Sequence, residues 1–315
     1  MDGVLIVDKP AGLTSHDVVA RVRRILRERR VGHTGTLDPF ATGVLVVLVG
    51  RATRLAQFLS GAVKEYEAVV RFGYATDTGD LTGARLAVPG AQNEEGVRVH
   101  TWSDAEVEAA LAGLRGEIEQ VPPMYSAKKV EGRKLYELAR QGVEVERRAA
   151  RVTIYELTAE RSGGALFSEN GDGTLDLSVR VRCSAGTYVR TLAESIGERL
   201  GAPAHLASLR RTRAGHFRVE GATGLDELKT KAEAGATDFL LPLDAALPEL
   251  PFVHLTADEA RRALHGIALR MDASGGWREG QAVGMRGADG RLIAVGLYDA
   301  ASLSLRPRVV FSPEK

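Results

Sequence analysis

The chain has 315 residues, of which 44% are hydrophobic and 26% charged, so it can bury a core, and wholly disordered, collagen-like and coiled-coil proteins are excluded. It shows no apolar run of the ~18 residues that a membrane span needs and no signal peptide, which predicts a cytoplasmic protein without a membrane partner. The single cysteine, Cys183, excludes an internal disulfide and a multi-cysteine zinc site, and the net charge of +1 argues against a strongly basic nucleic-acid-binding protein.

Patterns along residues 1–245 alternate between strand and helix. Residues 3–8 form an apolar run typical of a buried strand, and Thr14 and Ser15 begin a helix whose apolar residues recur every three or four positions. The following patterns predict a loop over 32–39, strands over 43–49 and 66–73, a mostly looped stretch over 77–100, helices over 103–114 and 134–140, paired strands over 151–160 and 175–184, and a helix over 191–200. This irregular mixture indicates an α+β fold with a mixed, mainly antiparallel sheet flanked by helices.

A break in these patterns falls at 240–252, where three prolines interrupt an acidic stretch. A short helix over 257–264 and a hairpin with strands over 281–286 and 291–298 follow the break. We therefore expect one domain over 1–245 and a small β-rich domain over 250–315.

The charges are unevenly distributed. Residues 1–60 carry nine Lys and Arg against five Asp and Glu, whereas residues 221–260 carry eight Asp and Glu against two Lys. The nearly neutral total can therefore hide a basic face that is offset by an acidic segment elsewhere.

Asp38 is the most informative acidic residue. Pro39 directly follows it and disfavours helical geometry at Asp38. A carboxylate in a glycine-rich loop before a buried strand can act as a nucleophile or general base, but it can also be a turn residue that bonds its own backbone. His33 in the same loop can contact a phosphate or a base edge, or it can simply pack locally.

Four further segments carry candidate residues. Tyr66 begins a strand, where its ring can stack on a base or fill a half-buried position. Tyr188 and Arg190 lie between a strand and a helix, and an arginine at a helix N-terminus opposes the helix dipole, which favours a specific partner such as a buried carboxylate. Lys128 and Arg210 belong to short cationic runs, which are usually solvated faces. No phosphate-binding, dinucleotide-binding or nucleophile-elbow motif is present, so these residues alone specify no reaction.

Together, these segments resemble the TruB family of tRNA pseudouridine synthases, motif after motif in chain order. The matching motifs are GVLIVDKPAG at 3–12, GHTGTLDPFATG at 32–43, KEY at 64–66, TDTGD at 76–80, PMYSAKK at 123–129, GRKLY at 132–136, CSAGTYVRT at 183–191 and HLASLRRT at 205–212. The C-terminal part is similar, with weaker motifs, to the small PUA-type RNA-binding domain of bacterial members.

The resemblance implies an isomerase that flips uridine 55 out of the T-loop of tRNA and converts it to pseudouridine without a metal or cofactor. It implies that Asp38 is the nucleophile, that Tyr66 stacks on the base and can take part in proton transfer, and that Arg190 pairs with Asp38. The substrate contacts that it implies are His33, Tyr188, Leu209, Lys9, Pro10, Lys128 and Arg210. Whether Asp38 attacks C6 of uracil or C1′ of ribose stays open.

We expect the partner to be the T-arm stem-loop of tRNA, bound by a monomer through an arginine-rich groove around Asp38. A competing hypothesis is an RNA-binding or tRNA-folding protein whose main role needs no catalysis. A glycosidase would need a second positioned carboxylate, and the sequence shows no Asp or Glu in a context comparable to that of Asp38.

Overall fold

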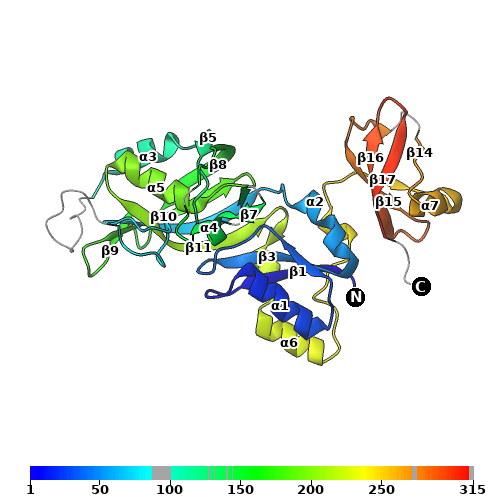
Figure 1. Ribbon diagram of the computed structural model, residues 1–315, viewed down its shortest axis with the longest axis horizontal. Coiled ribbons are helices and arrows are strands. Elements are labelled where there is room, and N and C mark those ends of the chain that lie inside the picture. Colours follow the sequence, from blue (N-terminus) through cyan, green and yellow to red (C-terminus); the bar gives the residue numbers. More distant parts are fainter. Residues whose placement is uncertain are drawn as a thin grey trace.

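A ten-stranded sheet forms the larger part of the computed structural model, which describes residues 1–86, 101–126, 128–130, 132–139, 141–143, 145–271 and 275–311. The strand order is β1-β3-β11-β4-β10-β8-β5, with β2, β9 and β12 attached at the sides (Figure 1). The strands are β1 (Gly3–Lys9), β2 (Val31–Thr34), β3 (Thr42–Val49), β4 (Lys64–Phe72), β5 (Gly116–Gln120), β8 (Ala150–Glu160), β9 (Phe167–Glu169), β10 (Leu175–Cys183), β11 (Ala204–Ala214) and β12 (Phe217–Arg218). Among the described pairings of this sheet, β3 with β11 is parallel and the others are antiparallel, which confirms the expected fold class.

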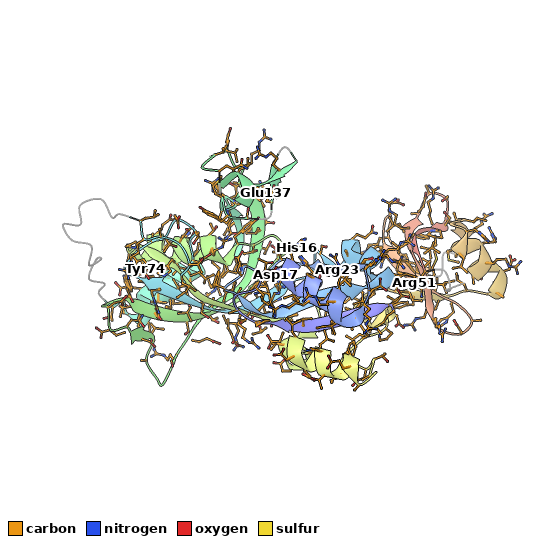
Figure 2. All side chains as sticks on the ribbon, turned by 60° about the horizontal axis from the view of Figure 1, so that its bottom comes forward. His16, Asp17, Arg23, Arg51, Tyr74 and Glu137 are labelled. Carbon is orange, nitrogen blue, oxygen red and sulfur yellow. The ribbon has the colours of Figure 1, made fainter. Side chains whose placement is uncertain are left out.

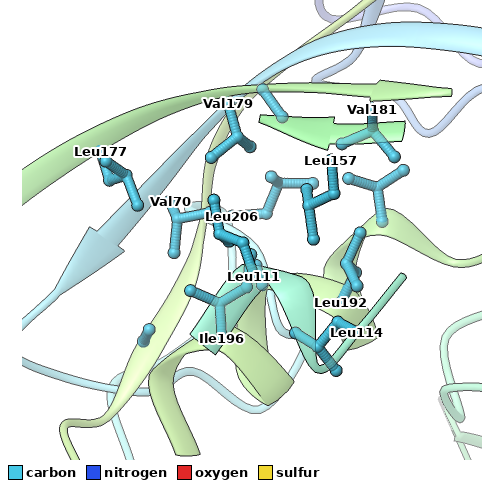
Figure 3. Packing of buried hydrophobic residues seen from close by; sticks show 14 of the residues in the cluster. Val70, Leu111, Leu114, Leu157, Leu177, Val179, Val181, Leu192, Ile196 and Leu206 are labelled. Atoms are coloured by element: carbon cyan, nitrogen blue, oxygen red, sulfur yellow. The ribbon is translucent and has the colours of Figure 1, made fainter. Parts of the chain in front are cut away.

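Helices cover one face of the central strands. α3 (Asp104–Ala112) and α5 (Val189–Leu200) pack their apolar residues onto β4, β8, β10 and β11 to form the largest core cluster (Figure 3). Leu111 from α3 and Ile196 from α5 meet strand residues such as Leu157 and Leu206, and all four side chains are almost completely buried. α1 (Ser15–Leu26) and α6 (Leu225–Glu233) cover β1, β2 and β3 in a second cluster.

The cap of α1 forms as expected. Thr14 accepts a hydrogen bond from the backbone N–H of Asp17, and the Asp17 carboxylate accepts one from the backbone N–H of Thr14. Such a capping box satisfies two backbone donors that have no partner within the helix. It fixes the start of α1 next to the loop that carries Asp38.

The other face of the central strands is polar. Cross-strand ion pairs occupy it, including Arg71 with Asp176 at 2.7 Å and Arg213 with Glu65 at 2.9 Å. Every second residue along β4 and β10 is buried, so each of these strands has one buried and one polar face. Several arginines are therefore paired with carboxylates on the face away from α3 and α5.

Several elements, such as β5 and α6, have no counterpart among the predicted elements, and two that carry candidate residues also differ from the expectations. The sequence pattern predicts a loop at His33 and Thr34, but both belong to β2, which pairs with β3. β11 has no counterpart among the predicted strands, although it is central, because arginines lie on both of its faces and two register shifts interrupt its alternation. The expected loop over 77–100 is described only as far as residue 86, and 87–100 lies outside the described residues.

A short arm follows β5. It contains β6 (Lys129–Val130), β7 (Arg133–Lys134) and α4 (Leu135–Ala139). Figure 2 shows this part of the chain, marked by Glu137, standing out from the body of the sheet.

The last part of the chain forms a second sheet with the order β13-β15-β16-β17-β14. Its elements are β13 (Phe252–His254), α7 (Ala257–Leu264), β14 (Leu269–Arg270), β15 (Ala282–Arg286), β16 (Leu292–Asp299) and β17 (Ser304–Val310). Two contacts join the second sheet to the preceding part of the chain: an ion pair of Arg286 with Asp244 at 3.0 Å, and a hydrogen bond from Arg54, near α2 (Ala56–Leu59), to the Val310 carbonyl. No helix in the described ranges is long and apolar enough to cross a membrane.

Candidate active site

A cavity of about 360 Å³ opens beside β4 and β11 on the helix-covered side of the sheet. Six of the ten residues that the sequence suggested line it: Asp38, Tyr66, Lys128, Tyr188, Arg190 and Leu209. The structure thus brings together residues from five separate segments of the chain. A cavity of this size suits a small organic group such as a nucleobase with part of its ribose.

Two residues of the N-terminal segment, Lys9 and Ser15, form hydrogen bonds with the loop that carries Asp38. The buried Ser15 hydroxyl accepts a hydrogen bond from the Leu37 N–H at 2.9 Å and donates one to the Leu37 carbonyl at 3.1 Å. Lys9 is fully buried, and its Nζ donates to the carbonyls of Pro39, Pro10 and Leu13 at 3.1, 2.9 and 2.6 Å. These contacts on both sides of Asp38 fix the backbone that aims its carboxylate.

Arg190 pairs with Asp38 in a two-point contact. Its Nε lies 3.0 Å from Asp38 Oδ2, and its Nη2 lies 3.2 Å from Oδ1. The arginine side chain is only 5% exposed and also donates to the carbonyls of Thr78 and Tyr125 at 2.9 and 2.7 Å. Each hydrogen bond reduces the freedom of the guanidinium, so Asp38 has a fixed orientation.

A second carboxylate, Asp80, lies 3.5 Å from Nη1 of Arg190 and is buried. It accepts hydrogen bonds from the hydroxyls of Thr78 and Thr82 at 3.0 and 2.6 Å. One guanidinium therefore contacts two carboxylates. The sequence analysis found no second acid in a context comparable to that of Asp38, so it missed Asp80. The TDTGD motif, which ends at Asp80, was the one feature of the sequence that could have indicated this residue.

Burial and charge act against each other at Asp38. Burial raises the pKa of its carboxyl above the ordinary value, the Arg190 charge lowers it, and the Asp80 charge raises it again. The net direction is upward. Arg190 is therefore the main charge that favours the ionised form of Asp38.

Tyr66 lies on β4 with its side chain buried in the helix-covered face. Two buried cations adjoin it in the cavity wall, Lys64 from the same strand and Arg211 from β11. Burial and the nearby Arg211 charge together lower the pKa of Lys64 to about 8. The sequence pattern places Arg211 in a solvated cationic run, yet its spacing of two residues from Leu209 puts both on one face of a strand.

Tyr188 caps α5 at the cavity rim. Its backbone N–H donates to Gln120 Oε1 at 2.9 Å, and its carbonyl accepts from Gln120 Nε2 at 3.2 Å. Burial raises the pKa of its phenol. Gln120, at the end of β5, was not singled out by the sequence, and it fixes the turn that leads to Arg190.

The remaining four sequence candidates do not line the cavity. His33 is half-buried on β2, its ring is 5.8 Å from that of His16, and burial lowers its pKa to about 4. Lys9 lies beneath the Asp38 loop, as described above, and Pro10 is exposed beside it. Arg210 points to the polar face, where it pairs with Asp8 at 2.8 Å, so it is not brought to the cavity.

Among the described residues, no group of three or more His, Cys, Asp or Glu side chains could hold a metal ion. Cys183 is buried, and burial raises the pKa of its thiol to about 11, so it contributes to packing.

Comparisons with known proteins show the family of the chain. The model of the TruB family pseudouridylate synthase N-terminal domain matches residues 23–189, and that of the tRNA pseudouridylate synthase B C-terminal domain matches residues 190–248. The chain is 48% identical over 274 residues to the tRNA pseudouridine synthase B of Geobacillus thermodenitrificans, which covers 87% of each chain. It is 46% identical over 314 residues to that of Thermobifida fusca, which covers 99% of each chain.

Solved structures are similar over almost the whole length. A chain of an H/ACA RNP bound to a substrate RNA containing 2′-deoxyuridine superposes with a TM-score of 0.69 at 25% identity, covering 99% of this chain and 85% of that one. A chain of a Cbf5-Nop10-Gar1 complex gives 0.69 at 28% identity, covering 99% and 84%. The resemblance drawn from the motifs is thereby confirmed: the chain belongs to the TruB family of pseudouridylate synthases and is an enzyme of that family.

Proposed function

We propose that this enzyme converts uridine 55 in the T-loop of tRNA to pseudouridine, with Asp38 as the nucleophile. The observation that carries the proposal is the oriented Asp38 carboxylate, paired with the buried Arg190 and open to a cavity of about 360 Å³. The names of the relatives, tRNA pseudouridine synthase B, support the choice of tRNA as substrate.

The reaction exchanges one glycosidic bond for another. The bond between N1 of uracil and C1′ of ribose breaks, the base turns, and a bond between C5 and C1′ forms. C5 loses a proton and N1 gains one, so the reaction needs neither a redox partner nor an energy donor. In the proposed mechanism Asp38 supplies the nucleophile, Tyr66 stacks on the base, and Tyr188 with Leu209 forms the walls of the pocket.

The charge of the cavity supports a nucleotide as its occupant. Three buried cationic side chains, Lys64, Arg190 and Arg211, line the cavity. Lys9 is buried beneath the Asp38 loop, and the carboxylates that face these four cations are Asp38 and Asp80. The excess of positive charge favours a phosphate next to the flipped nucleoside, and Lys128 at the rim adds to it. This attraction offsets the few kcal/mol that unstacking a base costs.

The second sheet, within residues 250–315, is proposed as a PUA-like RNA-binding domain. Arg306 and Arg308 on β17 are both exposed. Replacing both by alanine should weaken binding of the RNA and reduce its salt dependence, while the rate at saturating RNA is retained. A loss of rate at saturation with unchanged binding would contradict this assignment.

The decisive experiment is incubation with an unmodified T-arm stem-loop, followed by mapping of pseudouridine, for the wild type and Asp38→Asn. The wild type should modify position 55, and Asp38→Asn should bind the RNA without modifying it. Asp176→Asn is a matched control, because Asp176 also pairs with an arginine in a two-point contact but lies on the opposite face of the sheet. Pseudouridine formed by Asp38→Asn at the wild-type rate would refute the catalytic role, and binding without modification by the wild type would favour the RNA-folding hypothesis.

A further inference from the structure

Arg211 is a buried cation without a carboxylate partner among the described residues. Its side chain is 1% exposed, and its Nε and Nη2 donate to the carbonyls of Val44 and Gly35 at 2.6 and 2.8 Å. The arginines on either side of it in the chain differ, because Arg210 pairs with Asp8 and Arg213 pairs with Glu65. Burying an unpaired charge is costly, so this position favours a negative charge that arises only during the reaction.

Tyr66 is the side chain best placed to carry that charge. Arg211 and Tyr66 are direct partners across the antiparallel pair of β11 and β4, which places their Cβ atoms about 5 Å apart on the same face. Both residues line the cavity, and the Arg211 charge lies close enough to the Tyr66 phenol to act on its ionisation. Since an arginine can only donate, a hydrogen bond between the two side chains would leave the phenol O–H available to the cavity.

The titration behaviour of Tyr66 is consistent with this geometry. Burial raises the pKa of the phenol above its ordinary value of 10.0, and the Arg211 charge is the largest opposing influence. Tyr66 is thus a neutral phenol before the reaction, and Arg211 is the group that lowers the free energy of its anion.

We propose that Arg211 is a positioning residue that lets Tyr66 act as a proton shuttle, by holding the phenol oxygen and stabilising its phenolate. The proposal rests on the proposed function. When the N1–C1′ bond breaks, its electron pair stays on the base, and the Tyr66 O–H gives its proton to N1. If Asp38 attacks C1′, its oxygen bonds to C1′ as N1 leaves, and C5 later displaces that oxygen as it bonds to C1′. The phenolate then takes the proton from C5, and the electrons of the C5–H bond restore the ring double bond. Tyr66 ends as the phenol with which it began, so no other acid or base is consumed.

A purely structural role of Arg211 makes a different prediction. Its bonds to the Val44 and Gly35 carbonyls connect β11 with β3 and the Asp38 loop. If these bonds were the whole contribution of Arg211, the fold-losses in rate caused by the Arg211 and Tyr66 substitutions would multiply in the double variant. In a shuttle, the two residues act on one step, so the losses should not multiply.

The first test is a double-mutant cycle in the full chain, measured as the single-turnover rate of pseudouridine formation in a T-arm stem-loop. Arg211→Met should lower the rate about 100-fold or more, Tyr66→Phe should do at least as much, and the double variant should be no slower than Tyr66→Phe alone. Arg213→Met, which removes an arginine from the other face of the same strand, should keep the wild-type rate. Multiplying losses would overturn the proposal.

The second test measures the phenol directly and includes a variant that keeps a cation. Tyr66→3,5-difluorotyrosine gives a ¹⁹F signal whose titration midpoint should rise by about one pH unit or more with Arg211→Met and by less with Arg211→Lys. If Arg211→Met does not fold, Arg211→Lys alone should still raise the midpoint and reduce the rate, because lysine lacks the planar fork. An unchanged midpoint in Arg211→Lys together with a wild-type rate would overturn the proposal.

The two proposals fail in different ways. Retained activity in Asp38→Asn would refute the nucleophile and leave the titration of Tyr66 unaffected. Loss of activity in Asp38→Asn together with a wild-type rate in Arg211→Met would refute the role of Arg211 alone.

Discussion

The contact between Arg190 and Asp38 gives the most detailed prediction, namely that removing the guanidinium moves the acid limb of the rate–pH profile upward. The shortest distance in this ion pair is 3.0 Å, at which the Coulomb attraction is about 5 kcal/mol for an effective dielectric constant of about 20. Desolvation offsets part of this attraction, and removing one partner of a buried pair typically costs about 3–5 kcal/mol. Taking ~3 kcal/mol as the loss, the pKa of Asp38 should rise by about two units in Arg190→Met.

The sign follows from the direction of the shift. Burial already raises the pKa of Asp38, so the nucleophilic carboxylate forms only as the pH rises through that raised value. Without Arg190, the nearby Asp80 adds repulsion that raises the pKa of Asp38 further. At pH values below the pKa of Asp38, the rate of Arg190→Met should therefore be about 100-fold lower than the wild-type rate. At higher pH, where Asp38 is ionised in both proteins, the difference in rate should become smaller.

The assay is single-turnover pseudouridine formation in a T-arm stem-loop from about pH 5 to pH 9. Arg190→Lys keeps a charge without the two-point contact and should show a smaller shift. Arg71→Met is the control, because Arg71 makes a two-point contact with Asp176, at 2.7 and 2.8 Å, on the polar face of the sheet. If the acid limb of Arg190→Met coincided with that of the wild type, Arg190 would not control the ionisation of Asp38.

Three further predictions concern stability and reactivity. The pKa of Lys64 is lowered to about 8 in the folded chain, so above that pH the unfolded chain binds more protons than the folded chain. The melting temperature should therefore rise between about pH 8 and pH 10, and this rise should be smaller in Lys64→Met. Gly43 has a φ of +98°, and a Cβ there would lie 2.2 Å from the Arg211 carbonyl oxygen, so Gly43→Ala should lower the free energy of unfolding by about 2–5 kcal/mol in urea titrations. Gly221→Ala, where an added Cβ would have nothing within 4 Å, should cost far less, and equal losses would contradict the steric explanation. Cys183 is buried and the pKa of its thiol is raised to about 11, so a thiol reagent at neutral pH should modify it only in urea, and rapid labelling of the folded chain would argue against its place in the core.

Local patterns predicted most elements in which one short-range rule dominates. The capping residues around Thr14 marked the start of α1, and the alternation from Leu177 to Cys183 marked both faces of β10. β11 escaped prediction because its arginines occupy both faces and two register shifts break its period. Alternation of apolar and polar residues does not indicate a strand when one of its buried positions holds a charged residue such as Arg211.

The sequence by itself determined the α+β class, the Asp38 loop and the family, because each depends on residues that are adjacent in the chain. Only the tertiary structure decided which charges meet: Arg190 reaches Asp38 across 152 positions and also contacts Asp80. It also decided that Arg210 and Arg211, neighbours in one cationic run, point to opposite faces, one paired with Asp8 and the other buried opposite Tyr66. The physical reason is the register between β4 and β11, which long-range backbone pairing sets and which fixes the face on which every side chain lies.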